Sequence, residues 1–236
     1  MKKLHLQEIS KTDVAVFVLL AICSGLMIGI GATASLLAQN LFNDWGKIIG
    51  AVLFSLGIYA IVTFEMKLFT GMVADIPKMP KKNFWTLPVC FIGNAIGVAC
   101  MTLLVTFTPI SDMLVAQATS IVEGKFNVEY WYLSAFSSST LCGVLITISI
   151  WSANHSPRNG LSATLGVILP IVIFAFCGFD HCIANLFYFD LYAEFSWRII
   201  GYNTIAIVGN LFGGVVLPLA MIWREKTRAQ EKQENN

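Results

Sequence analysis

One histidine of this sequence stands inside a long apolar stretch. His181 is preceded by a run rich in Leu, Ile, Val and Phe, whereas His5 lies near the N-terminus and His155 lies beside a loop. An imidazole exchanges a proton near physiological pH, and an ionisable side chain at membrane depth usually serves function. A neutral histidine that bonds to a backbone carbonyl is the structural alternative.

Polar residues interrupt the apolar stretch around His181, and a second such interruption precedes Thr70. The hydroxyl of Thr70 would point toward the same central point as His181, unless it bonds back to its own helix. The two interruptions are Phe64-Glu65-Met66-Lys67-Leu68 and Phe179-Asp180-His181-Cys182-Ile183. We expect their charged residues to cap helix ends or to pair with one another. Bulky apolar residues lie at helical spacing around the interruptions, as core packing or as constrictions of a pore: Phe54, Ile58, Leu68, Phe69 and Phe174.

The composition indicates a membrane protein. The chain has 236 residues, of which 56% are hydrophobic and 12% charged, with a mean hydropathy of +0.72. A soluble domain carries about twice that charge, so soluble enzymes and disordered scaffolds are excluded. The balance of 15 Lys and Arg against 14 Asp and Glu offers no basic surface for nucleic acid.

Six uncharged runs are long enough to cross a bilayer as helices, which takes roughly 20 residues each. They cover Val14–Asn43, Ile48–Phe64, Asn83–Ser111, Tyr130–His155, Asn159–Phe179 and Ile199–Trp223. None alternates like a strand of an outer-membrane barrel, so the predicted fold class is all-α. We expect one transmembrane domain over 14–223, a segment 1–13 before it and a tail 224–236 after it, with a first helix that acts as signal anchor.

Basic residues predict the orientation, because Lys and Arg collect in cytoplasmic loops. With the N-terminus inside, eleven of them lie in cytoplasmic segments and three outside, namely Lys47, Lys125 and Arg198, while Lys67 stays within the membrane zone. Both termini are therefore expected in the cytoplasm, and the location is the inner or plasma membrane. The six cysteines lie in or beside apolar runs without a CxxC pair, which favours reduced packing residues over metal ligands.

An internal repeat relates the two halves, about 14–111 and 128–223. The third run holds Gly93-Asn94-Ala95-Ile96-Gly97 and the sixth holds Gly209-Asn210-Leu211-Phe212-Gly213, 116 positions apart (209 minus 93). The second and fifth runs are interrupted at corresponding places. With three helices per half, the second half enters from the opposite side, which predicts an inverted repeat with two broken helices around a midplane site. Helix N-termini at such a site favour an anion.

These residues resemble the formate-nitrite transporter family of formate, nitrite and hydrosulfide channels. Residues 178–185, Gly-Phe-Asp-His-Cys-Ile-Ala-Asn, are similar to the family signature G-F-E-H-S-I-A-N, and residues 68–71, Leu-Phe-Thr-Gly, are similar to its L-F-T-G segment. The resemblance covers residues 14–223. It implies an aquaporin-like fold of six helices that assembles as a homo-pentamer with one pore per protomer.

The resemblance also implies roles for individual residues. His181 and Thr70 would form the central pair, Leu68 and Phe54 the outer constriction, and Ile58 and Phe174 the cytoplasmic one. Phe69 lies beside them, and Lys67, Asn94, Asn185 and Asn210 would be supporting polar residues. The family's lysine near the start of the fourth helix is expected near Asn127 or Val128, where this chain has only Lys125 close by; Lys67 is a possible replacement.

We therefore expect a channel for small monovalent weak-acid anions, with formate or nitrite first and hydrosulfide, acetate or lactate as further candidates, and with proton coupling in the pore. A membrane-embedded enzyme would need a cofactor-ligand set or a nucleophile-base pair, and the sequence offers neither, so we expect no cofactor. An aquaporin-like channel for neutral solutes stays as the alternative, although the paired N-P-A motifs are absent.

Overall fold

The structure, a computed structural model, describes residues 11–155 and 160–234. Most of the predicted N-terminal segment, Arg158 and the last two residues therefore lie outside the described residues. Every element of the described part is helical: α1 (Lys11–Leu41), α2 (Asn43–Thr63), α3 (Phe69–Met72), the 3-10 turns η1 (Val73–Lys78) and η2 (Lys81–Asn83), α4 (Thr86–Thr106), α5 (Ser111–Phe126), α6 (Trp131–His155), α7 (Gly160–Cys177), α8 (Cys182–Tyr192) and α9 (Trp197–Glu234).

Six of these helices are long and apolar enough to cross a membrane, as the sequence predicted. The six spans are Asp13–Leu41, Asn43–Thr63, Lys81–Thr106, Trp131–Ala153, Gly160–Cys177 and Trp197–Glu231. Large apolar side chains such as Leu103 and Phe176 remain exposed along them, as a lipid-facing surface requires. The protein is an all-α, multi-pass membrane protein.

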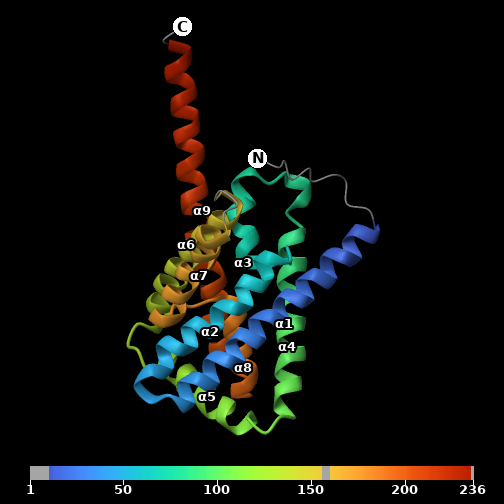
Figure 1. Cartoon of the computed structure of the whole chain (residues 1–236), viewed down its shortest axis with the longest axis vertical. Coiled ribbons are helices and arrows are strands. Elements are labelled where there is room, and N and C mark those ends of the chain that lie inside the picture. The colour runs from blue at the N-terminus through green and yellow to red at the C-terminus, as the bar shows by residue number, and fades with distance from the viewer. Residues whose placement is uncertain (1–10, 156–159, 235–236) are drawn as a thin grey trace.

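Two groups of three spans form the walls of the molecule. α1 packs along α2 and α4, and α6 packs along α7 and α9, while the short α3 and α8 lie in the interior between them (Figure 1). Figure 1 shows α5 at one end of the molecule, opposite the start of α1 and the end of α9. We call these the α5 end and the terminal end.

The G-N-x-x-G segments hold the wall helices close together. A Cβ on Gly97 of α4 would overlap the carbonyl oxygen of Ile22 in α1, and a Cβ on Gly213 of α9 would overlap the carbonyl oxygen of Thr140 in α6. Only glycine permits this approach, which is typical of small-residue packing between membrane helices.

Helices α2 and α7 end in the same local motif. Met66 N–H bonds to Ile61 O and Phe179 N–H bonds to Phe174 O, the six-to-one hydrogen bond of a Schellman motif. The left-handed residue that the motif requires is Glu65 in one case and Gly178 in the other. Each helix therefore ends directly at its polar interruption, and the chain turns back into the interior.

Two helical segments were not predicted from the sequence. Residues 111–126, for which no element was predicted, form the amphipathic helix α5, because Leu114, Ala118 and Val122 recur at helical spacing and are buried. The last helix continues beyond Trp223 through the predicted tail to Glu234. Its end projects past the other helices at the terminal end (Figure 1).

We predict opposite effects for the same substitution at two glycines. Gly97→Ala should lower the free energy of unfolding by about 1–3 kcal/mol, because the added methyl group meets backbone rather than a movable side chain. Gly124→Ala on α5 has nothing within 4 Å of the new Cβ and should gain up to about 1 kcal/mol of helix propensity. Thermal unfolding in detergent, followed by size-exclusion chromatography, measures both. Equal stability of Gly97→Ala and the parent chain would contradict the packing argument.

Candidate functional site

A threonine and a histidine from the two interior helices meet in the core. Thr70 Oγ1 of α3 lies 2.8 Å from Nε2 of His181, which precedes α8, and both side chains are buried. His181 Nδ1 accepts a hydrogen bond from the N–H of Ala184 at 3.2 Å. A neutral imidazole has one acceptor and one donor nitrogen, so Nε2 carries the proton and donates to Thr70. The threonine hydroxyl then has its own proton to donate to another group at this point.

Asn94 of α4 holds the chain before α3 in place. Its Oδ1 accepts from the N–H of Phe69 at 2.8 Å, and its Nδ2 donates to the carbonyls of Ala21 and Lys67, each at 2.8 Å. The segment is extended at Leu68, so its backbone groups have no partners within a helix. The buried amide supplies those partners and thereby places Thr70.

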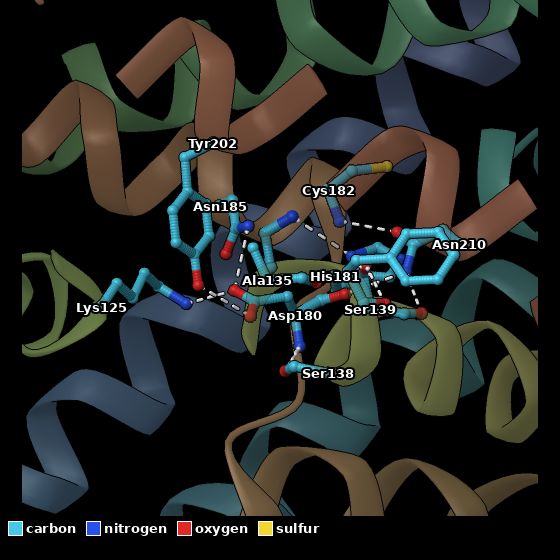
Figure 2. Close-up of polar contacts among 12 residues, drawn as sticks. Lys125, Ala135, Ser138, Ser139, Asp180, His181, Cys182, Asn185, Tyr202 and Asn210 are labelled. Carbon is cyan, nitrogen blue, oxygen red and sulfur yellow. Dashed lines mark hydrogen bonds and ion pairs between the residues drawn. The ribbon is translucent and has the colours of Figure 1, made fainter. Parts of the chain in front are cut away.

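Asn210 of α9 does the same for the chain before α8. Its Oδ1 accepts from the N–H of Cys182 at 2.9 Å, and its Nδ2 donates to the carbonyls of Ser139 at 2.7 Å and Asp180 at 2.9 Å (Figure 2). The residue in the extended conformation is here His181. Both asparagines that the sequence singled out therefore support the pair, each through three hydrogen bonds.

A cavity of about 170 Å³ reaches His181 from the α5 end. The polar residues of its wall are Ser35, Gln39, Lys47, Lys125, Asn185 and Tyr188. Lys47 Nζ lies 5.6 Å from the centroid of the Phe176 ring. Two lysines and no acidic residue line the cavity, so its wall attracts anions.

Two phenylalanines line the cavity beside the pair. The rings of Phe54 and Phe174 contact edge to face with centroids 5.6 Å apart, and Phe174 stacks on the imidazole of His181 at 5.9 Å. Both line the cavity and contact each other, whereas the resemblance implied that Phe54 is grouped with Leu68 and Phe174 with Ile58.

The other three apolar residues lie deeper in the core. Ile58, Leu68 and Phe69 are buried in the main hydrophobic cluster and do not line the cavity. The ring of Phe69 packs edge to face on Phe91, with centroids 5.4 Å apart. All three residues belong to the same core cluster as Phe54 and Phe174. Ile58 lies one helical turn after Phe54 on α2.

The charged residues of the two interruptions do not pair with one another: Asp180 forms its ion pair with Lys125 rather than with Lys67 (Figure 2). Its Oδ1 also accepts from Asn185 Nδ2 at 3.2 Å, and its Oδ2 accepts from the hydroxyl of Tyr202 at 2.9 Å. The resemblance placed a lysine near Asn127, and Lys125, the basic residue close to that position, is brought here by α5. Helix α5 was not predicted from the sequence, and no sequence signal pointed to Tyr202, which comes from another span.

Lys67 does not take over this role. Its backbone carbonyl accepts from Asn94 and from the thiol of Cys90 at 3.3 Å, and its side chain does not line the cavity. The residues that the structure describes contain no cluster of three or more His, Cys, Asp or Glu suited to a metal ion. All six cysteines are free.

Comparison with known proteins agrees with this architecture. The family model described as "Formate/nitrite transporter" matches residues 2–224. The chain belongs to the formate/nitrite transporter family. It is 26% identical over 199 residues to formate channel FocB of Escherichia coli K12 (79% of this chain, 69% of the relative). It is 25% identical over 206 residues to formate channel FocA of Haemophilus influenzae (73% and 72%).

Solved structures of the family share the fold. That of a "Pentameric formate channel with formate bound" superposes with a TM-score of 0.78 at 24% identity, covering 92% of this chain and 99% of that chain. A second structure, of an "FNT family ion channel", superposes with a TM-score of 0.77 at 20% identity, covering 92% and 93%. The six spans described here are therefore arranged as in channels of this family.

We predict that the asparagine amides dominate the stability of the site. Asn210→Leu removes the partners of the Asp180 carbonyl and of the Cys182 N–H, and unpaired buried groups cost about 1–3 kcal/mol each, so the variant should unfold at much lower temperature. The matched control is Asn203→Leu, seven positions earlier on α9: Asn203 is also buried, but its Oδ1 has no partner, and we expect little loss. Similar melting temperatures for the two variants would contradict this.

Proposed function

We propose that this chain forms a transmembrane channel for small monovalent anions of weak acids, with formate and nitrite as the first substrates and hydrosulfide and lactate as further ones. The observation that carries the proposal is the buried hydrogen-bonded pair of Thr70 and His181, of which His181 lines a cavity shared with two phenylalanine rings and two lysines. The relatives named as formate channels support the substrate class.

The path of an anion follows from the order of these groups. Lys47 and Lys125 attract the anion into the cavity, and the rings of Phe54 and Phe174 then strip its water. Placing a bare charge among apolar groups is expensive unless it is neutralised or hydrogen-bonded. The hydroxyl proton of Thr70 bonds to the anion there, and a proton taken up in the pore converts it to the neutral acid. The neutral acid then passes Ile58, Leu68 and Phe69.

We infer that the two halves are an inverted repeat around this pair. Three observations support the inference: the matching asparagine frames, the two Schellman motifs, and the constant offset between equivalent positions of the interruptions. Glu65 corresponds to Gly178, Lys67 to Asp180 and Phe69 to Cys182, each 113 positions apart (178 minus 65, 180 minus 67, 182 minus 69). The domain then comprises residues 14–223, with half-repeats of about 14–111 and 128–223.

We propose a homo-pentamer with one pore per protomer and with both termini in the cytoplasm. The likeness to the pentameric formate channel supports the assembly. The basic residues support the orientation, since the segment of η1 and η2 and the last part of α9 lie toward the terminal end (Figure 1). These segments carry Lys78, Lys81, Lys82, Arg224, Lys226 and Arg228. The α5 end, with its cavity, then faces outward.

The first test is anion uptake into proteoliposomes that contain the purified chain and a pH-sensitive dye. We expect selective uptake of formate or nitrite over chloride, together with a change in internal pH, because the acid crosses with a proton. Hydrosulfide and lactate are measured in parallel, and protein-free liposomes are the control. Uptake of none of these anions by an intact pentamer, together with swelling in glycerol, would replace the proposal by a channel for neutral solutes.

The second test concerns the central pair. Thr70→Val and His181→Asn should each lower uptake about tenfold or more, the usual effect of removing a group that stabilises the charge in transit, and His181→Asn should change the pH dependence of uptake. The matched control is Thr164→Val, because the hydroxyl of Thr164 only bonds back to Gly160 O of its own helix. Unchanged uptake and pH dependence in both pair variants would contradict the assignment. Loss of assembly would instead assign the pair a structural role.

A further inference from the structure

One tyrosine contacts both partners of the buried ion pair. The hydroxyl of Tyr202, on α9, donates to Asp180 Oδ2 at 2.9 Å, and the centroid of its ring lies 5.4 Å from Lys125 Nζ. Figure 2 shows the three side chains converging from α5, α9 and the chain before α8. Tyr202 itself does not line the cavity, so any effect on an anion passes through the ion pair.

Aromatic neighbours fix the ring of Tyr202. It stacks on Trp131 with centroids 6.0 Å apart and planes 17° apart, and Phe126 meets it edge to face at 5.3 Å. Arg198 covers the outer side of this cluster, with its guanidinium 4.5 Å from the Phe126 centroid, and donates to Phe126 O at 3.1 Å. With the ring held on these sides, the hydroxyl stays directed at Asp180.

The hydroxyl determines how the carboxylate is shared. Asp180 Oδ1 receives Lys125 and Asn185, while Oδ2 receives Tyr202. A lysine ammonium shared between both oxygens would have more of its charge neutralised by the carboxylate. With Tyr202 on Oδ2, the ammonium contacts Oδ1, and Lys125 lines the cavity with 12% of its side-chain surface exposed while that of Asp180 keeps 4%.

We propose that Tyr202 is a positioning residue for anion entry: by occupying Asp180 Oδ2 and contacting Lys125 through its ring, it keeps the lysine charge available to the cavity. The inference rests on the proposed anion channel. In this arrangement Asp180 holds the Lys125 ammonium in place, and Tyr202 limits how far Asp180 neutralises its charge. Lys125 in turn attracts the anion.

The test compares Tyr202→Phe with Tyr132→Phe, a control that removes one hydroxyl from a nearby aromatic contact of Trp131. Uptake of formate and of nitrite into proteoliposomes is measured against anion concentration at low ionic strength, where electrostatic attraction is least screened. We expect Tyr202→Phe to raise the half-maximal concentration about three- to tenfold, as partial loss of a hydrogen bond to a charged group would, with an unchanged maximal rate. Tyr132→Phe should match the wild type.

A double variant separates positioning from general stability. In a Lys125→Gln background, Tyr202→Phe should leave the half-maximal concentration unchanged, because the charge on which it acts is gone. A further increase in that background, or a fall of the maximal rate alone in the single variant, overturns the inference. So does a half-maximal concentration in Tyr202→Phe equal to that of the wild type.

Two further outcomes are distinguishable. If Tyr202→Phe does not assemble, the comparison moves to Asp180→Asn and the double variant Asp180→Asn with Tyr202→Phe. These two variants must have equal half-maximal concentrations, because the hydroxyl acts only through the carboxylate. Unequal values overturn the inference. A wild type that takes up neither anion overturns the proposed function together with the inference. Wild-type uptake without an effect of Tyr202→Phe overturns the inference alone.

Discussion

The amides of Asn94 and Asn210 make it possible for two membrane helices to be interrupted in an apolar interior. A backbone N–H or C=O without a partner is costly where water is absent, and each interruption would leave several. Each asparagine satisfies one N–H and one carbonyl of the interrupted segment and a second carbonyl of a wall helix. The amide has the donors and the acceptor for this, and an aspartate or leucine in its place would not.

The positions of the functional side chains depend on these two frames. Thr70 lies one residue after the amide-bound N–H of Phe69, and His181 lies one residue before that of Cys182. Their side chains meet at 2.8 Å because Gly97 and Gly213 allow the asparagine-bearing helices to approach α1 and α6 closely. Small residues and amides thus act together: the glycines set the spacing of the walls, and the asparagines set the position of the chain between them.

A buried ion pair stands beside this apolar centre, although burying charges rarely increases stability by itself. Asp180 compensates part of its desolvation through Asn185 and Tyr202, and its own N–H donates to Ser138 Oγ at 2.9 Å. The pair is best understood as an arrangement of charge. It presents a lysine to the cavity while the carboxylate remains enclosed by hydrogen-bond donors.

Local sequence was sufficient for the six spans and for the candidates of the site. The six spans follow from uncharged runs, because only a helix satisfies its own backbone in lipid, and His181, Thr70 and the two asparagines stand out as polar residues in apolar surroundings. The spacing of Leu114, Ala118 and Val122 carried a local signal for α5 that was missed, whereas the contact of Phe54 with Phe174 and the partners of Asp180 were not accessible in this way. Phe54 and Phe174 are 120 positions apart (174 minus 54), and Lys125, Asp180 and Tyr202 come from three different segments. Hydropathy and spacing act along the chain, whereas contacts between segments arise only when the walls pack, so the tertiary structure alone decided which ring faces which and which cation the carboxylate receives.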